Sequence, residues 1–148
     1  MRSGIQKVSV GFTGTQKGMT SLQRRGVAQL LSTLKPSAFH HGDCEGADEE
    51  AHVLADAEMI PIIIHPPTNS TKRAFCHEHD NVSSVEVLEE FGYLVRNRHI
   101  VDDSDVLIAT PRTMFEEQRS GTWATIRYAR KCRKIVYIIW PKKAVNAS

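Results

Sequence analysis

The chain has 148 residues, of which 41% are hydrophobic, 24% charged and 7% aromatic. This composition is typical of one globular domain, predicted here over 1–148, and it excludes collagen-like, coiled-coil and intrinsically disordered proteins. The formal net charge is only +2 at pH 7, so we do not expect the basic surface that nucleic-acid-binding domains usually carry.

Hydropathy and cysteine usage predict where the protein resides. No apolar run reaches the roughly 18 residues that a membrane span needs, and no apolar signal segment follows Arg2. Cys44, Cys76 and Cys132 are widely spaced and form neither a disulfide framework nor a zinc-binding pattern. We therefore expect a cytoplasmic protein with reduced cysteines, no membrane association and no bound metal or other cofactor.

The first half of the chain alternates strand and helix patterns. A run that alternates apolar and other residues ends in a Thr-Gly-Thr turn, and a capping box from Thr20 to Gln23 then opens a helix that Pro36 ends. A β-branched isoleucine run follows a second helix of small residues. The predicted strands are 8–12, 38–40 and 60–64, and the predicted helices begin at Thr20 and near Gly46.

The second half continues the alternation after an irregular segment. Residues 68–90 show no clean period and contain a Cys-His-Glu-His-Asp run, whose spacing matches no standard zinc site, so we expect an exposed polar loop. A helix is predicted from Tyr93, with Arg96 on its outer side together with His99 and Asp103. The remaining predicted elements are a strand at 106–109, a loop at 110–119, a helix that Ser120 caps and a strand at 135–140.

Alternating buried strands and amphipathic helices predict an α/β, Rossmann-like three-layer domain with a five-stranded, mainly parallel sheet. In such sheets ligands bind beyond the carboxyl ends of the strands. Three loops rich in Gly, Ser and Thr lie at those ends, and each leads into a helix whose free N–H groups favour anions. The alternative is that they are ordinary turns and helix caps. The three segments are 13–20, 42–48 and 120–122.

Other polar residues near these loops have two interpretations each. Asp43 fits a contact to ribose hydroxyls, whereas Asp48 fits a stabilising role at a helix N-terminus. Arg96 fits a bidentate phosphate contact or a surface salt bridge. The histidines are more typical of packing and hydrogen bonding than of catalysis; they are His40, His41, His52 and His65.

Four segments in order resemble the SLOG superfamily, the Rossmann-like group that contains DNA-processing Smf proteins and lonely-guy-type phosphoribohydrolases. The segments are 11–15, 41–48, 96–101 and 120–122, and they span nearly the whole chain. The resemblance implies a nucleotide-derived ligand at the strand ends. The ligand-binding residues expected from the loops and the resemblance are Thr13, Gly14, Thr15, Gly42, Asp43, Gly46, Arg96, Asn97, Ser120, Gly121 and Thr122.

The resemblance also bears on catalysis. The hydrolases carry an essential Glu in a Pro-Gly-Gly-x-Gly-Thr-x-x-Glu motif, and Thr125 stands at that place here. A hydroxyl cannot replace a carboxylate in stabilising oxocarbenium charge or activating water. The candidates for an alternative catalytic group are Glu116, Glu117 and Asp43.

Three functions follow as hypotheses. The first is a binder of a nucleotide or an NAD- or ADP-ribose-derived molecule, which sequesters a signalling nucleotide, for example in phage counter-defence. The second is a nucleotide N-glycosidase that cleaves a nucleoside monophosphate. The third and weakest is a DNA-processing-type binder of single strands, which would need a basic groove with aromatic side chains. By analogy with other small Rossmann-like domains we also expect a homo-oligomer.

Overall fold

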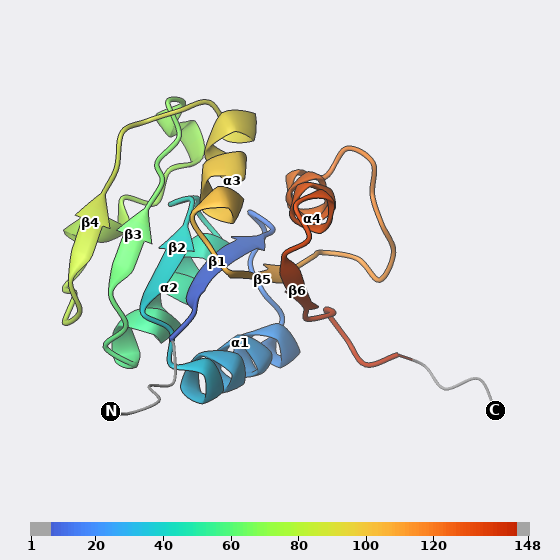
Figure 1. Ribbon diagram of the computed structural model, residues 1–148, viewed down its shortest axis with the longest axis horizontal. Coiled ribbons are helices and arrows are strands. Elements are labelled where there is room, and N and C mark those ends of the chain that lie inside the picture. The colour runs from blue at the N-terminus through green and yellow to red at the C-terminus, as the bar shows by residue number, and fades with distance from the viewer. Residues whose placement is uncertain (1–6, 145–148) are drawn as a thin grey trace, which may run out of the picture.

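Six parallel strands form the central sheet of residues 7–144, the part of the chain that the computed structural model describes (Figure 1). The sheet order is β4-β3-β2-β1-β5-β6. The chain thus builds outward from β1 in one direction and then in the other, which places the topological switch point between β1 and β5. The strands are β1 (Ser9–Gly14), β2 (Ala38–His41), β3 (Ile62–Ile64), β4 (Val85–Val87), β5 (Val106–Thr110) and β6 (Ile135–Ile138).

Four α-helices cover the two faces of the sheet in the described residues. Figure 1 shows α1 and α2 on one face and α3 and α4 on the other. The segment between β3 and β4 contains two 3-10 turns, η1 (Ser70–Lys72) and η2 (Cys76–Glu78). None of the helices in this part of the chain is both long and apolar enough to cross a membrane. The helices are α1 (Ser21–Leu34), α2 (Ala47–Ala57), α3 (Tyr93–Asp102) and α4 (Gly121–Lys131).

Strand β5 shows how the sheet divides the core in two. Val106 and Ile108 pack in the core that contains residues of α1 and α2, whereas Leu107 and Ala109 pack with residues of α4. Successive side chains of a strand point to opposite faces, so an apolar strand such as β5 supplies both cores.

The predicted Rossmann-like three-layer fold is confirmed, with one more strand than the five expected and with every strand pair parallel. The additional strand, β4, has three residues and lies at the sheet edge, where Val87 is half-exposed. Its short Val-Glu-Val pattern is too brief to stand out within the irregular 68–90 segment. The sequence around Arg2 lies outside the described residues.

Candidate functional site

A cleft of about 770 Å³ opens at the carboxyl ends of β1, β2 and β5. This volume suits a small-molecule ligand. The loop after β1, the loop after β2, helix α3 and the loop before α4 form its walls. The fold thus brings together segments that are widely separated in the sequence, at the place where doubly wound sheets bind ligands.

Most of the residues expected from the sequence line this cleft. They come from each of the three Gly-rich loops and from α3. The lining residues among them are Thr13, Gly14, Thr15, Gly42, Arg96, Asn97, Ser120, Gly121 and Thr122.

Arg96 is a buried cation at this cleft. Its side chain donates to the carbonyl oxygens of Gly42 and of His65, the latter at 3.3 Å, and its Nε donates to Oδ1 of Asn97 at 2.7 Å. Its Nη2 makes only a weak contact to the sulfur of Cys44 at 3.8 Å. Within residues 7–144 no carboxylate lies within 4.0 Å of the guanidinium. A buried positive charge without an ion-pair partner favours an anion beside it.

The inward position of Arg96 differs from the expected one. The helical pattern predicted Arg96 on the outer side of α3, whereas Arg96 is only 5% exposed and its apolar neighbour Leu94 is 69% exposed. The backbone carbonyls at the ends of β2 and β3 accept the guanidinium hydrogen bonds, and they compensate the cost of burying it.

The N-terminus of α4 presents backbone donors to the cleft. Ser120 caps the helix by accepting from the N–H of Trp123 at 3.2 Å, as the sequence predicted. The N–H groups of Gly121 and Thr122 stand in the first turn, where no intrahelical acceptor exists. Since both residues line the cleft, these amides and the positive end of the helix dipole suit a phosphate oxygen.

The loop after β2 offers fewer free backbone donors than the start of α4, because several of its N–H groups already donate to other groups of the protein. The N–H of Asp43 donates to His41, that of Cys44 to Asp48, and that of Ala47 to the carbonyl of Thr15. Gly46 does not line the cleft. It adopts a positive φ of 87° and places α2 against the loop after β1. This loop supports the wall and offers fewer donors than expected.

Asp43 is fully buried away from the cleft. Its carboxylate accepts from Nε of Arg73 at 2.7 Å and from the backbone N–H of Cys76 at 2.9 Å. The carboxylate therefore ties the 68–90 segment to the end of β2. Nothing in this arrangement supports the predicted contact with ribose.

Asp48 is the acidic group that the sequence interpretation missed. It lines the cleft, is buried, and accepts from the N–H of Cys44 at 3.1 Å. Burial raises the pKa of Asp48 to about 6, although the nearby Arg96 charge acts in the opposite direction. The sequence signal, an acid in the first turn of a helix, does not separate this role from dipole stabilisation.

The other candidate acids lie on the loop before α4. Glu117 lines the cleft and pairs with Arg112 at 3.1 Å, whereas Glu116 is exposed and pairs with Arg127 at 2.7 Å. Thr125, at the place of the hydrolase Glu, donates its hydroxyl to the carbonyl of Gly121 at 2.9 Å and is buried. Further lining residues that the sequence did not single out for ligand contact are Gln16, Lys17, Tyr93, Arg112 and Arg119.

The fold has several relatives among solved structures, although the sequence matches no family model and no curated protein significantly. The molybdenum cofactor binding protein from Rippkaea orientalis superposes with a TM-score of 0.67 at 19% identity, over 94% of this chain and 80% of that one. The Moco carrier protein from Chlamydomonas reinhardtii superposes with a TM-score of 0.61 at 22% identity, over 90% of this chain and 76% of that one.

A third similar structure is DNA processing protein A from Streptococcus pneumoniae, with a TM-score of 0.66 at 18% identity. The similarity covers 88% of this chain but only 49% of that protein. At these identities the likeness concerns the fold. The chain thus shares a Rossmann-like α/β fold with these three proteins.

Proposed function

We propose that this protein binds a small molecule with a phosphate or pyrophosphate group, of the nucleotide or ADP-ribose type, in the cleft at the strand ends. The observation that carries the proposal is Arg96, a buried cation that lines the cleft and has no carboxylate within ion-pairing distance in the described residues. A bound phosphate would supply the missing negative charge.

Two further features support an anionic ligand. The free amides at the start of α4 lie on the same cleft as Arg96, and Lys17, Arg112 and Arg119 line it as well. Two of the fold neighbours are named for a cofactor that they bind or carry, so this fold is used to hold small molecules. We extend the proposal to sequestration of a signalling nucleotide, which mass spectrometry of molecules released from the purified, denatured protein tests directly.

Calorimetric titration with ADP-ribose, AMP and inorganic pyrophosphate tests the binding itself. Arg96→Gln removes the charge, and we expect the affinity to fall at least about tenfold, because charge-assisted hydrogen bonds contribute about 1.5–3 kcal/mol. Arg98→Gln is the matched control, since Arg98 lies on the same helix, is exposed and stacks over Tyr128. Circular dichroism checks that both variants fold. Failure of all three probes to bind, or equal binding by Arg96→Gln, contradicts the proposal.

A second candidate function is cleavage of a nucleotide N-glycosidic bond. Asp48 favours it, because a carboxyl group with a pKa of about 6 in a ligand cleft suits general acid–base work at neutral pH. Incubation with AMP, followed by chromatography for free adenine, tests this reaction. Release of adenine that Asp48→Asn abolishes would support it. Intact AMP in a sample that demonstrably binds AMP would exclude it for that substrate.

A further inference from the structure

Two pairs of buried histidines lie on opposite faces of β2. His40 and His41 are consecutive in the strand, so their side chains point to opposite sides of the sheet. His41 contacts His52 of α2, with 2.9 Å between Nε2 and Nδ1. His40 contacts His65, with 2.8 Å between Nδ1 and Nε2. Each pair also has a third metal-ligating side chain nearby, Cys76 for the first and Asp103 for the second.

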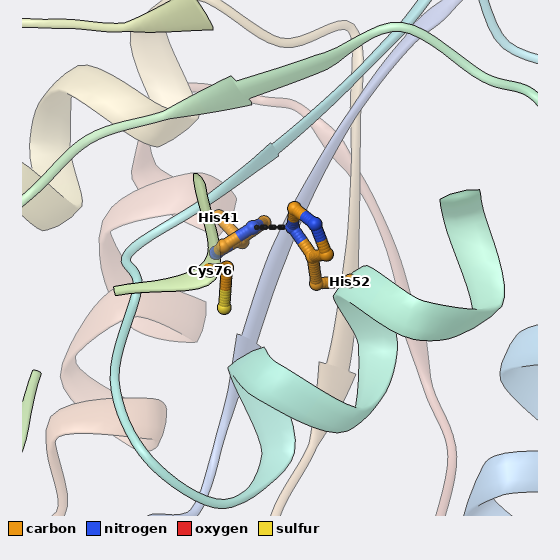
Figure 2. A group of neighbouring side chains, drawn as sticks. All are labelled: His41, His52 and Cys76. Carbon is orange, nitrogen blue, oxygen red and sulfur yellow. Dashed lines mark hydrogen bonds between the residues drawn. The ribbon is translucent and has the colours of Figure 1, made fainter. Parts of the chain in front are cut away.

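The first cluster, His41, His52 and Cys76, is shown in Figure 2. Its hydrogen bonds fix the position of every ring proton. The backbone N–H of Asp43 donates to Nδ1 of His41 at 2.9 Å, so the proton of His41 is on Nε2 and is donated to His52. His52 then carries its proton on Nε2 and donates it to Oδ1 of Asn81 at 2.6 Å.

A metal ion does not fit this first cluster. To free Nε2 of His41, its proton would have to move to Nδ1, which faces the N–H of Asp43. The thiol of Cys76 is also unfavourable, because burial and the neighbouring Asp43 carboxylate raise its pKa and keep it protonated. The cluster is a closed hydrogen-bond network that holds the 68–90 segment against α2.

The second cluster, His40, His65 and Asp103, has no such obstacle. The three ligand atoms lie within 4.8 Å of one another, and Oδ2 of Asp103 is 4.0 Å from Nε2 of His65. The hydrogen bonds of the described residues engage neither Nε2 of His40 nor Nδ1 of His65. The proton between the two rings can therefore move to one of these nitrogens by tautomerisation, which leaves both facing lone pairs for a metal.

Burial and charge at this second cluster also suit a cation. His40 and His65 are almost fully buried, while the Asp103 side chain is 51% exposed and opens the cluster to solvent. Histidine binds metals through a lone pair of its neutral imidazole. The negative charges of Asp103 and Glu86 near His40 favour a bound cation, whereas the positive charge of Arg96 near His65 disfavours one.

We propose that His40, His65 and Asp103 bind a divalent transition-metal ion of the Zn²⁺ class. The ligands are Nδ1 of His40, Nε2 of His65 and a carboxylate oxygen of Asp103, with the remaining position open to solvent. Two imidazoles and one carboxylate are a donor set that Zn²⁺, Co²⁺ and Fe²⁺ accept, and three protein ligands with an open position are typical of reactive rather than structural sites. The sequence predicted no metal, because these residues are too far apart to form a recognisable spacing.

Titration of the protein, without a polyhistidine tag, with Co²⁺ and Zn²⁺ at pH 7.5 tests this site. We expect visible cobalt absorption bands and calorimetric Zn²⁺ binding with one ion per chain. Asp103→Asn is the main variant, because its exposed position spares the fold, and it should weaken Zn²⁺ binding more than about tenfold. Asp80→Asn removes the same charge from another exposed aspartate and should bind as the wild type does.

The first cluster, which contains Cys76, is the competing location for a bound ion, and two further variants distinguish it from the second cluster. His65→Gln should abolish the cobalt bands, whereas Cys76→Ser should leave them unchanged. No metal binding by the wild-type chain, or equal binding by Asp103→Asn, overturns the proposal. A sulfur-to-cobalt charge-transfer band that disappears in Cys76→Ser also overturns it, because it would place the ion at the first cluster. These readouts do not depend on the ligand of the cleft, so they test the metal site independently of the proposed binding function.

Discussion

At the scale of single residues, the cleft places the buried carboxyl group of Asp48 near the buried guanidinium of Arg96, without a direct ion pair between them. Asp48 is a carboxyl group whose pKa burial raises from 3.8 to about 6. Arg96 lies near enough to lower that pKa in part, but the two side chains do not come within 4.0 Å. A carboxyl group whose pKa is raised in this way, beside a charged side chain in a cleft, is typical of functional sites.

The raised pKa of Asp48 predicts how stability depends on pH. Well below pH 4 the carboxyl is protonated in the folded and unfolded states alike, so it has no effect. Above pH 6 it is ionised in both, and the folded state is destabilised by about 2–3 kcal/mol, a loss that develops between about pH 4 and 6. Asp48→Asn should therefore raise the free energy of unfolding at pH 7.5 by up to this amount and leave it unchanged at pH 3.5. Urea denaturation at both pH values measures the difference, and an equal gain at both pH values would refute the assignment.

The same carboxyl predicts how ligand binding depends on pH. An ionised Asp48 repels a phosphate in the cleft, so binding should tighten as the pH falls from 7.5 to 5.5 and Asp48 becomes protonated. ADP-ribose is the appropriate probe because its pyrophosphate diester stays ionised in this range. Calorimetry should show this tightening for the wild type and a flat profile for Asp48→Asn. An identical pH profile in both proteins would show that another group is responsible.

At the scale of elements, Gly46 joins α2 to the loop after β1. A Cβ at this position would collide with the backbone carbonyl of Gln16, and the φ of 87° is unfavourable for any other residue. The contact matters because the N–H of Ala47 donates to the carbonyl of Thr15 at 3.0 Å, which sets the distance between two walls of the cleft.

Gly46→Ala should therefore lower both stability and ligand affinity. The strained backbone alone costs about 1–3 kcal/mol, and the loop after β1 must move away from α2. Thermal unfolding and ADP-ribose titration measure the two effects. Gly92→Ala is the matched control, since Gly92 has a φ of −60° and a Cβ there meets no atom within 4 Å. Similar melting temperatures for the two variants would show that the loop tolerates the collision.

The elements also show which features the sequence could predict. Local chemistry was sufficient for the caps: Thr20 and Gln23 exchange the predicted hydrogen bonds at 3.2 and 3.0 Å, and Ser120 caps α4. Residues whose partners are distant in sequence were not predictable in this way. Asp43 pairs with Arg73, thirty positions further on, and nothing near Asp43 indicates which way its carboxylate points. The inward position of Arg96 likewise depends on carbonyls at the ends of two other strands.

At the scale of the whole molecule, one sheet supports both the cleft and the two histidine clusters. The two cores both include residues of β5 and β6, so the prediction of a single domain implies one cooperative unfolding transition. The expected homo-oligomer stays a prediction. Leu94 and Val95 on α3 are exposed apolar side chains that such an interface would cover.

The distribution of charge over the molecule bears on the remaining function, binding of single-stranded DNA. The net charge is only +2, and the cations that line the cleft are local and accompanied by Asp48 and Glu117. The lining has two aromatic residues, Phe12 and Tyr93, and Phe12 is buried, so a row of bases has little to stack on.

We expect a labelled oligonucleotide to bind no more tightly than about 10⁻⁵ M at 150 mM salt, in the range of non-specific binding. Fluorescence anisotropy measures this, with ADP-ribose titrated into the same preparation as a control for competent protein. A submicromolar dissociation constant that rises steeply with salt would establish DNA binding and shift the proposed ligand from a free nucleotide to a nucleic-acid strand.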